Sequence, residues 1–140
     1  MKLNPYLMFN GQCEAAFKFY EQCLGGKITT MMTYGESPEP AMSDQVPPQW
    51  RNKILHVGLI VGDQELMGSD SPPEYREETK GFSVSINLND PAEAERIFHT
   101  LAENGKVQMP LQQTFWAYRF GMLVDQFGIP WMINCDQSGG

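Results

Sequence analysis

Hydrophobic positions recur at helical spacing in two segments of the chain. Residues 13–24, CEAAFKFYEQCL, place their apolar side chains on one stripe, and Gly25 and Gly26 end the pattern. Residues 92–104, AEAERIFHTLAEN, repeat that arrangement, and Gly105 is expected to stop it. This second helix is preceded by the expected start signals, which are the N-cap Asp90, the first-turn Pro91 and the capping-box partner Glu93.

Apolar stretches of strand length flank both helices. Each half of the chain therefore predicts the order strand, helix, strand, strand, strand. The expected strands are residues 6–9, 27–34, 53–61 and 66–69 in the first half, and 82–88, 106–109, 119–124 and 131–135 in the second.

The two halves are related as an internal repeat. Gly26-Lys27-Ile28 falls on Gly105-Lys106-Val107 at an offset of 79 residues. Further along, residues 56–61 fall on 119–124 at an offset of 63. The difference, 79 − 63 = 16, is assigned to the proline-rich, acidic stretch 35–50 of the first half. The loop 35–51 could be a lid, an excursion without a role or a segment packed on a partner subunit.

One module of this size could hardly bury its own sheet, whereas two paired modules could. We therefore expect an α+β fold in which two tandem βαβββ modules form a curled mixed β-sheet around a cavity, with the helices on the outer face. The length predicts a single domain, residues 1–140, with module 1 at about 1–70 and module 2 at about 80–137.

Alternation along the strands predicts which side chains face the helices and which face the cavity. The predicted helix-facing residues are Leu55, Val57, Leu59, Val61, Phe82, Val84, Ile86, Leu88, Phe120, Met122 and Val124. Polar residues of opposite parity would converge on the cavity, with His56 and Arg119 at equivalent positions of the two halves. This set is Tyr6, His56, Ser83, Ser85, Asn87 and Arg119. The alternative, strongest for Ser85 and Asn87, is that these side chains face solvent or a dimer partner.

The segments YLMFNGQCEAAFKFY and ENGKVQMPLQQTFWAYRFGMLVDQFGIPWMIN resemble the vicinal oxygen chelate superfamily. That superfamily includes glyoxalases, extradiol dioxygenases and the fosfomycin and bleomycin resistance proteins. Within it the chain is most similar to the PhnB-like branch, also labelled demethylubiquinone methyltransferase-like. The resemblance covers nearly the whole chain and is weakest in residues 35–51. It implies a homodimer with ligand cavities near or across the module interfaces.

The resemblance also implies where a metal ion would bind. In metal-using members, His, Gln or Glu on the first and last strands of each module hold the ion. Those positions fall near Asn4, Met67, Ser83 and Met132, whose amide, thioether and hydroxyl groups suit Zn²⁺, Ni²⁺ or Fe²⁺ poorly. We predict no cofactor. The alternative is a divalent metal at a site rebuilt from His56 with Glu65 or Glu36.

Charge and cysteine content narrow the classes of partner. A net charge of −7 argues against nucleic acid and against an anionic membrane surface. No apolar run approaches the roughly 20 residues of a membrane span, and the N-terminal segment lacks the features of a signal peptide. Three cysteines without CxxC spacing predict free thiols in a reducing cytoplasm. No glycine-rich strand-to-helix turn supports S-adenosylmethionine binding of the common kind.

These observations favour a small-molecule binding protein without a required metal. Arg119 would pair an anionic group, while Trp116 and Tyr118 would cover an apolar part of the ligand. The predicted ligand-binding residues are Tyr6, His56, Ser83, Trp116, Tyr118 and Arg119.

Two other functions stay open. The first is a lyase or transferase of the same superfamily acting on a small organic acid or phosphonate-like substrate, metal-dependent or with His56 as general base. The second is a structural subunit whose aromatic residues form only core and dimer contacts. Asp125 to Gly128 is expected to be a turn between strands, with Asp125 capping it.

Overall fold

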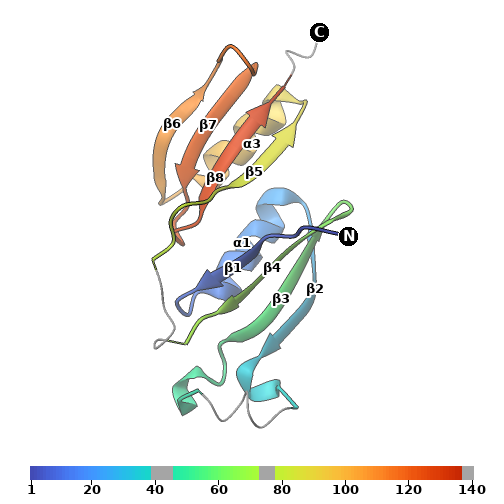
Figure 1. The fold of residues 1–140 in the computed structure, drawn as a ribbon, viewed down its shortest axis with the longest axis vertical. Coiled ribbons are helices and arrows are strands. Elements are labelled where there is room, and N and C mark those ends of the chain that lie inside the picture. The colour runs from blue at the N-terminus through green and yellow to red at the C-terminus, as the bar shows by residue number, and fades with distance from the viewer. Residues whose placement is uncertain (39–45, 73–77, 137–140) are drawn as a thin grey trace. The chain divides into compact units, whose positions relative to one another are not determined.

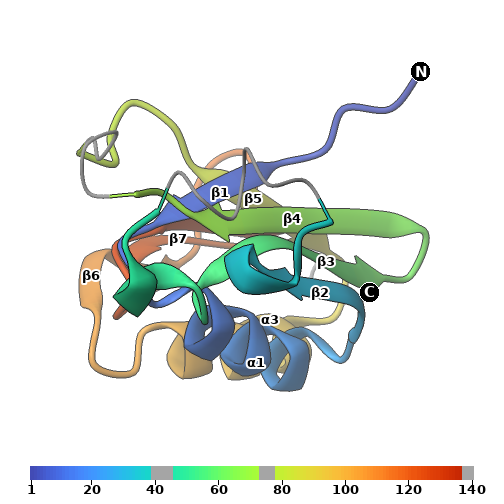
Figure 2. The same cartoon turned by 90° about the horizontal axis from the view of Figure 1, so that it is seen from below.

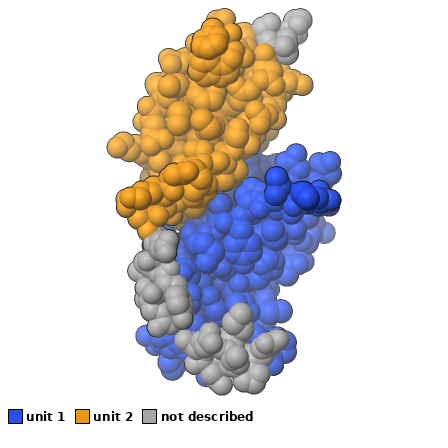
Figure 3. Space-filling view, in the orientation of Figure 1, with its two compact units in different colours: residues 1–77 blue, residues 78–140 orange. Residues whose placement is uncertain are grey.

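The structure, a computed structural model, describes residues 1–38, 46–72 and 78–136. The chain divides into two compact units, residues 1–77 and 78–140 (Figure 3). Each unit has the predicted βαβββ order, with one helix against one face of a four-stranded mixed sheet (Figures 1 and 2). This confirms the α+β class and the duplicated module. The enclosed cavity and the single-domain organisation stay predictions.

Unit 1 is a sheet in the order β1-β4-β3-β2, covered on one face by α1. Strands β1 and β4 run parallel, and the other pairs are antiparallel. The short 3-10 helices η1 (Tyr34–Glu36) and η2 (Pro48–Trp50) follow β2 and precede β3. The main elements are β1 (Tyr6–Phe9), α1 (Cys13–Leu24), β2 (Lys27–Thr33), β3 (Ile54–Val61) and β4 (Gln64–Asp70).

Unit 2 repeats this topology in the order β5-β8-β7-β6, with α3 against the central strands β7 and β8. Its parallel pair is β5 and β8. No helix among the described residues has the length and apolar character needed to cross a membrane. The elements are β5 (Val84–Leu88), α3 (Pro91–Leu101), β6 (Lys106–Gln112), β7 (Arg119–Val124) and β8 (Pro130–Cys135).

The helix ends follow local chemistry. Helix α1 has its predicted bounds, and Gly25 ends it at a φ of 70°. The Asp90 carboxylate caps α3 as predicted by accepting the backbone N–H of Ala92 at 3.1 Å. The predicted capping role of Glu93 is wrong, because its carboxylate pairs with Arg96 one turn along.

The helix side of unit 1 is a closely packed aromatic and aliphatic core. A Cβ atom at Gly68 would lie 2.7 Å from Cε1 of Phe17, so only glycine lets α1 approach β4 this closely. On β3, Val57 and Leu59 are fully buried, as predicted. Leu55 departs from the prediction, because a register shift at the start of β3 carries it to a second cluster. That cluster consists of Tyr34, Val46 and Trp50.

In unit 2 the predicted strand faces of β7 are reversed. Gly121 and Leu123 face the helix, since a Cβ at Gly121 would lie 2.6 Å from Phe98 of α3 and Leu123 is fully buried. Their register partners are Ile133 and Trp131, which are also buried.

The predicted helix-facing residues Phe120, Met122 and Val124 therefore lie on the opposite face of β7. Phe82 is also misassigned, because it precedes β5 and is 46% exposed.

The physical reason is a one-residue error in aligning the repeat. Leu7 pairs with Gly68, and Ile86, 79 residues after Leu7, pairs with Ile133. Val57 lies opposite Gly68, just as Gly121 lies opposite Ile133. The structural offset between β3 and β7 is therefore 121 − 57 = 64, whereas the predicted alignment, which places Gly58 on Gly121, has an offset of 63. A slip of one residue moves every side chain of a strand to the other face.

Candidate functional site

The sheet face of unit 1 that α1 does not cover is called here the open face of unit 1. The strand register shows which side chains of this face are neighbours in rows that run across the strands. In one row, Tyr6 lies opposite Met67, Met67 opposite Gly58, and Gly58 opposite Thr30. In the next, Met8 lies opposite Ser69 on β1 and β4, and Met32 lies opposite His56 on β2 and β3. This face therefore combines thioethers and small residues with one imidazole and one phenol.

Tyr6 and His56 meet on this face although β4 lies between their strands. The Tyr6 hydroxyl lies 3.1 Å from Nδ1 of His56, and the two rings are 5.7 Å apart at an interplanar angle of 32°. Tyr6 is 44% exposed and His56 is half-buried. Within the described residues, His56 has no other hydrogen-bonding partner. The contact orients the imidazole and leaves Nε2 for a ligand.

A carboxylate completes the same face. A Cβ atom at Gly58 would lie 2.8 Å from Oε2 of Glu65, so the Glu65 side chain occupies the space above this glycine. Glu65 is half-buried, and it makes no hydrogen bond or ion pair with another described residue. The sequence contains one signal for this contact, because a lone glycine inside an apolar strand such as Gly58 often marks a place where another group approaches the backbone.

The predicted site residues of unit 2 do not all lie on one side of the sheet. Arg119 does not lie on the open side of β7, because that strand places it on the helix side, where Nε is 3.9 Å from a carboxylate oxygen of Glu95 on α3. Its guanidinium also stacks over the ring of Tyr118 at 4.3 Å. The placement predicted for Arg119 is therefore wrong for the same one-residue reason.

Trp116 lies against the side of β7 that faces away from α3. Its ring contacts Phe120 edge to face at 5.3 Å, and the side chain is 51% exposed. Ser83 comes just before β5 and makes no hydrogen bond with another described residue. Among the six predicted ligand-binding residues, direct contacts join Tyr6 to His56 and Tyr118 to Arg119.

The residues at the superfamily's metal positions do not form a usual metal centre. Met67 lies on the open face of unit 1, and Met132 lies opposite Met122 on the corresponding side of β8. Asn4 and Ser83 precede the first strands of the two units. Within the described parts of the chain, no group of three or more His, Cys, Asp or Glu side chains could hold an ion. Because this donor set does not fit the metal, we derive no chemical step through one.

Glu36, the alternative ligand, is engaged elsewhere. Its carboxylate accepts hydrogen bonds from the backbone N–H and the hydroxyl of Thr33, both at 2.9 Å. These bonds lower the pKa of Glu36. The other carboxylates of the loop 35–51, Glu39 and Asp44, lie outside the described residues.

Two buried aspartates also have structural roles. Asp125 caps its turn as predicted, since Oδ1 accepts the N–H groups of Phe127 and Ile129, and Oδ2 accepts the indole N–H of Trp131 at 2.9 Å. Asp70 does the same in unit 1. Its carboxylate accepts three backbone N–H groups, those of Gly11, Cys13 and Ile54. Neither carboxylate belongs to the open face.

Comparison with known proteins identifies the family. The family model described as 3-demethylubiquinone-9 3-methyltransferase matches residues 1–134. The chain belongs to this PhnB-like family, and its fold is that of the vicinal oxygen chelate superfamily. Protein YjdN of Escherichia coli (strain K12) is 35% identical over 139 residues, which cover 96% of this chain and 95% of YjdN.

Solved structures agree. PA1353 from Pseudomonas aeruginosa is 50% identical, with a TM-score of 0.89 and 99% coverage of both chains. The PhnB protein of Bacillus cereus is 26% identical with a TM-score of 0.78, covering 96% of this chain and 99% of that one. A glyoxalase/bleomycin resistance protein/dioxygenase family enzyme from Burkholderia phytofirmans, at 12% identity, 96% and 97% coverage and a TM-score of 0.65, shares the fold alone.

The family's description does not transfer a methyltransferase mechanism to this PhnB-like protein. Each of its sheets contains one parallel strand pair and two antiparallel pairs. Common S-adenosylmethionine enzymes bind their cofactor at a glycine-rich turn of a parallel sheet. The function of this protein therefore depends on the side chains of its own site and not on the family's description.

Proposed function

We propose that this PhnB-like protein binds a small organic ligand on the open face of unit 1, without the superfamily's usual metal ion. The observation that carries the proposal is the contact between Tyr6 and His56, which orients an imidazole on a sheet face lined by methionines. Ligand sites typically combine an apolar lining with a few polar groups in fixed positions. Membership of a superfamily that includes small-molecule resistance proteins supports the same reading.

The exposure of the apolar side chains also supports a ligand. Met8 is 50% exposed and Tyr6 44%, although both lie on a strand of the sheet. Apolar side chains that remain accessible side by side commonly belong to a binding surface. In unit 2, Trp116 offers a similar apolar surface, and we propose it as a ligand contact of that unit. Ser83, Tyr118 and Arg119 of unit 2 stay predictions and are no part of the site proposed on unit 1.

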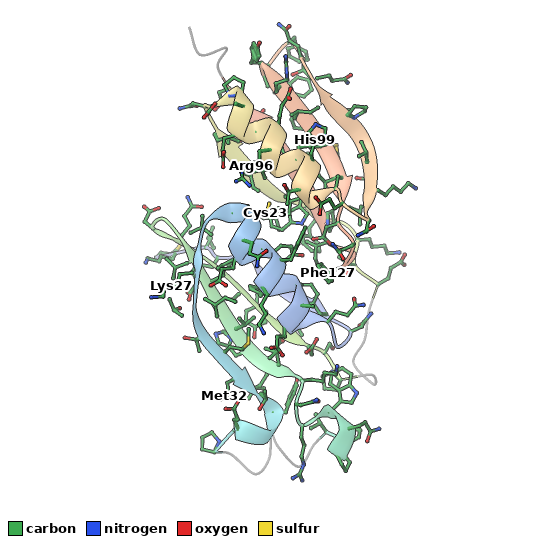
Figure 4. The ribbon with its side chains drawn as sticks, turned by 180° about the vertical axis from the view of Figure 1, so that it is seen from behind. Cys23, Lys27, Met32, Arg96, His99 and Phe127 are labelled. Carbon is green, nitrogen blue, oxygen red and sulfur yellow. The ribbon has the colours of Figure 1, made fainter. Side chains whose placement is uncertain are left out.

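A ligand screen by thermal shift tests this function. Wild-type protein is compared with His56→Ala and Tyr6→Phe, and His99→Ala serves as the matched control. His99 is the other histidine, exposed on α3 (Figure 4). We expect compounds that stabilise wild type and His99→Ala to lose most of their effect on the two site variants. Ligand shifts that remain equal in all four proteins would overturn the site.

Metal content is tested separately. Protein purified without chelator is analysed for Zn, Ni, Mn and Fe. We expect far less than one ion per chain. A stoichiometric ion would contradict the metal-free proposal, and His56→Ala and Glu65→Gln would then show whether it sits at a rebuilt site on the open face of unit 1.

A second candidate function is an enzyme of the same superfamily in which His56 acts as general base. The hydrogen bond between Tyr6 and His56 favours it. In the tautomer in which Nδ1–H donates to the Tyr6 oxygen, Nε2 carries no proton and can accept one in a fixed direction. Turnover of a ligand found in the screen would be lost in His56→Gln. It would persist in His99→Gln.

We further propose a homodimer in the cytoplasm. Exposed apolar side chains outside the ligand contacts proposed above, among them Phe82 and Phe115, support association with a second copy. Three buried, free cysteines support a reducing compartment. Sedimentation at several concentrations tests the dimer, and a monomer at every concentration would contradict it.

A further inference from the structure

We propose that the ligand of the open face of unit 1 is an apolar, flat molecule carrying a cationic or N–H-donating group, and that Glu65 binds this group. The inference rests on the function proposed above and names the chemical class of the ligand. It replaces the anionic ligand that the sequence suggested through Arg119.

The position of Glu65 is the first observation. Its carboxylate fills the space that a side chain at Gly58 would occupy, with Oε2 2.8 Å and Cδ 3.8 Å from that Cβ position. Gly58 lies on β3 beside Met67, in the middle of the sheet. A long acidic side chain from β4 is thereby brought over the centre of the open face. A larger residue at position 58 would displace it.

The state of this carboxylate is the second observation. Glu65 is half-buried, and among the described residues no donor or cation pairs with it. A partly desolvated carboxylate without a partner gains more from a cation or N–H donor than an exposed one does, because solvent screens the interaction less. The same charge repels a ligand carboxylate. The site therefore prefers a positively charged or donor group.

Other charges near this face do not reverse that preference. Lys27 lies opposite Ile60, and Ile60 lies opposite Glu65, so Lys27 is two strands away on the edge strand β2. No ion pair joins Lys27 to Glu65 among the described residues.

The lining around Glu65 accounts for the apolar part of the ligand. Met67 lies between Tyr6 and Gly58 in the strand register, and Met32 lies opposite His56. Thioether side chains adapt to irregular ligands and make favourable contacts with aromatic rings. Glu65 already covers Gly58, whereas Met67 and Met32 offer apolar surface on either side of β3. An aromatic ring could therefore lie over the methionines with its amine at Glu65 and a polar edge at His56.

Matched aromatic probes test the class. Amine, neutral and carboxylate derivatives of benzene, indole and naphthalene, such as tryptamine, 3-methylindole and indole-3-acetate, are titrated by calorimetry. We expect the amines to bind roughly tenfold or more tightly than the matched carboxylates, as one charge-assisted hydrogen bond would give. Glu65→Gln should bring the two within about threefold, because it removes the charge and keeps the shape.

Two further variants test whether the effect depends on the position of the Glu65 carboxylate. Asp63→Asn removes the same charge from an exposed position in the β3–β4 turn, and it should leave the amine preference unchanged. Gly58→Ala should displace Glu65 and reduce the preference as Glu65→Gln does, while leaving the thermal unfolding of the free protein nearly unchanged.

The possible failures are distinguishable. Tight binding of neutral or anionic probes that depends on His56 but not on Glu65 would overturn the ligand class and keep the proposed function. Binding that ignores both His56 and Glu65 would overturn the site altogether, and so would the absence of binding by every probe.

Discussion

A Cβ atom built on Gly121 would lie 2.6 Å from Cε2 of Phe98. Strand β7 therefore has room for no side chain at this position, where the Phe98 ring of α3 packs on its backbone. Unit 1 contains the same relationship between Gly68 and Phe17, at 2.7 Å, but there the glycine lies on β4. In both units an aromatic ring from the helix rests on the backbone of a central strand. These two contacts fix which face of each sheet turns to its helix and hence which face is open.

Replacing either glycine with alanine should destabilise the protein. In Gly121→Ala and Gly68→Ala, the new methyl group meets a buried ring and nearby backbone atoms that cannot move away freely. Such overpacking costs about 1–3 kcal/mol of unfolding free energy. Urea unfolding followed by circular dichroism measures it. Gly58→Ala is the matched control, because its nearest neighbour is the flexible end of Glu65. Equal stability of all three variants would contradict this account.

The sequence predicted the elements well because their signals are local. Helix α1 and strand β1 have the predicted bounds, and Asp90 caps α3 as expected. A helix is set by spacing within about a dozen residues and by its caps, so a single stretch of sequence contains the information.

The faces of β7 were harder to predict because they depend on register with distant strands. Whether Arg119 or Phe120 turns to the helix is decided by pairing with β8 and by the approach of Phe98 to Gly121. The helix-facing role of Phe120 and the open-side placement of Arg119 failed together for this reason. The contact between Tyr6 and His56 is consistent with the predicted strand faces. It joins residues 50 positions apart in the chain, so the local spacing of residues could not predict it.

Asp125 should be required for stability without taking part in binding. Its carboxylate is buried and accepts two backbone N–H groups and the indole N–H of Trp131. Asp125→Ala leaves these donors without their acceptor, which costs about 1–3 kcal/mol for each unsatisfied group. Asp125→Asn should cost less than Asp125→Ala, because one oxygen is retained.

Unfolding in urea, followed by tryptophan fluorescence, measures this loss. Asp136→Ala is the control, since Asp136 is exposed and accepts a bond from Asn134 at the surface. If Asp125→Ala were as stable as Asp136→Ala, the structural role would be wrong.

The three thiols should be unreactive in the native protein. Cys13 and Cys135 are fully buried, and Cys23 is 2% exposed. Burial raises the pKa of Cys13 above its usual value, and the charges of Asp70 and Glu14 raise it further. Because the thiolate is the reactive form, labelling by Ellman's reagent at pH about 8 should be slower than in guanidinium by on the order of 100-fold or more. Rapid reaction of one equivalent in native protein would show that one cysteine is accessible.

Tyr34 should make the folded state sensitive to alkaline pH. Its side chain is buried, and the hydroxyl donates to the backbone carbonyl of Asp70 at 2.7 Å. Burial, together with the charge of Asp70, raises the pKa of Tyr34 above the usual tyrosine value of 10.0. The folded state therefore favours the protonated phenol. This contribution to stability is fully present below pH about 10 and is lost as pH rises toward the folded pKa, because the unfolded chain ionises first.

Comparing wild type with Tyr34→Phe in urea across this range measures the effect. At pH about 8, Tyr34→Phe should be less stable by roughly 1 kcal/mol, because the hydrogen bond to the Asp70 carbonyl is lost. Above pH about 10 the difference should shrink, since phenylalanine has no proton to release in the unfolded state. A stability difference that stays constant from pH about 8 to about 11 would mean that the hydroxyl titrates alike in both states.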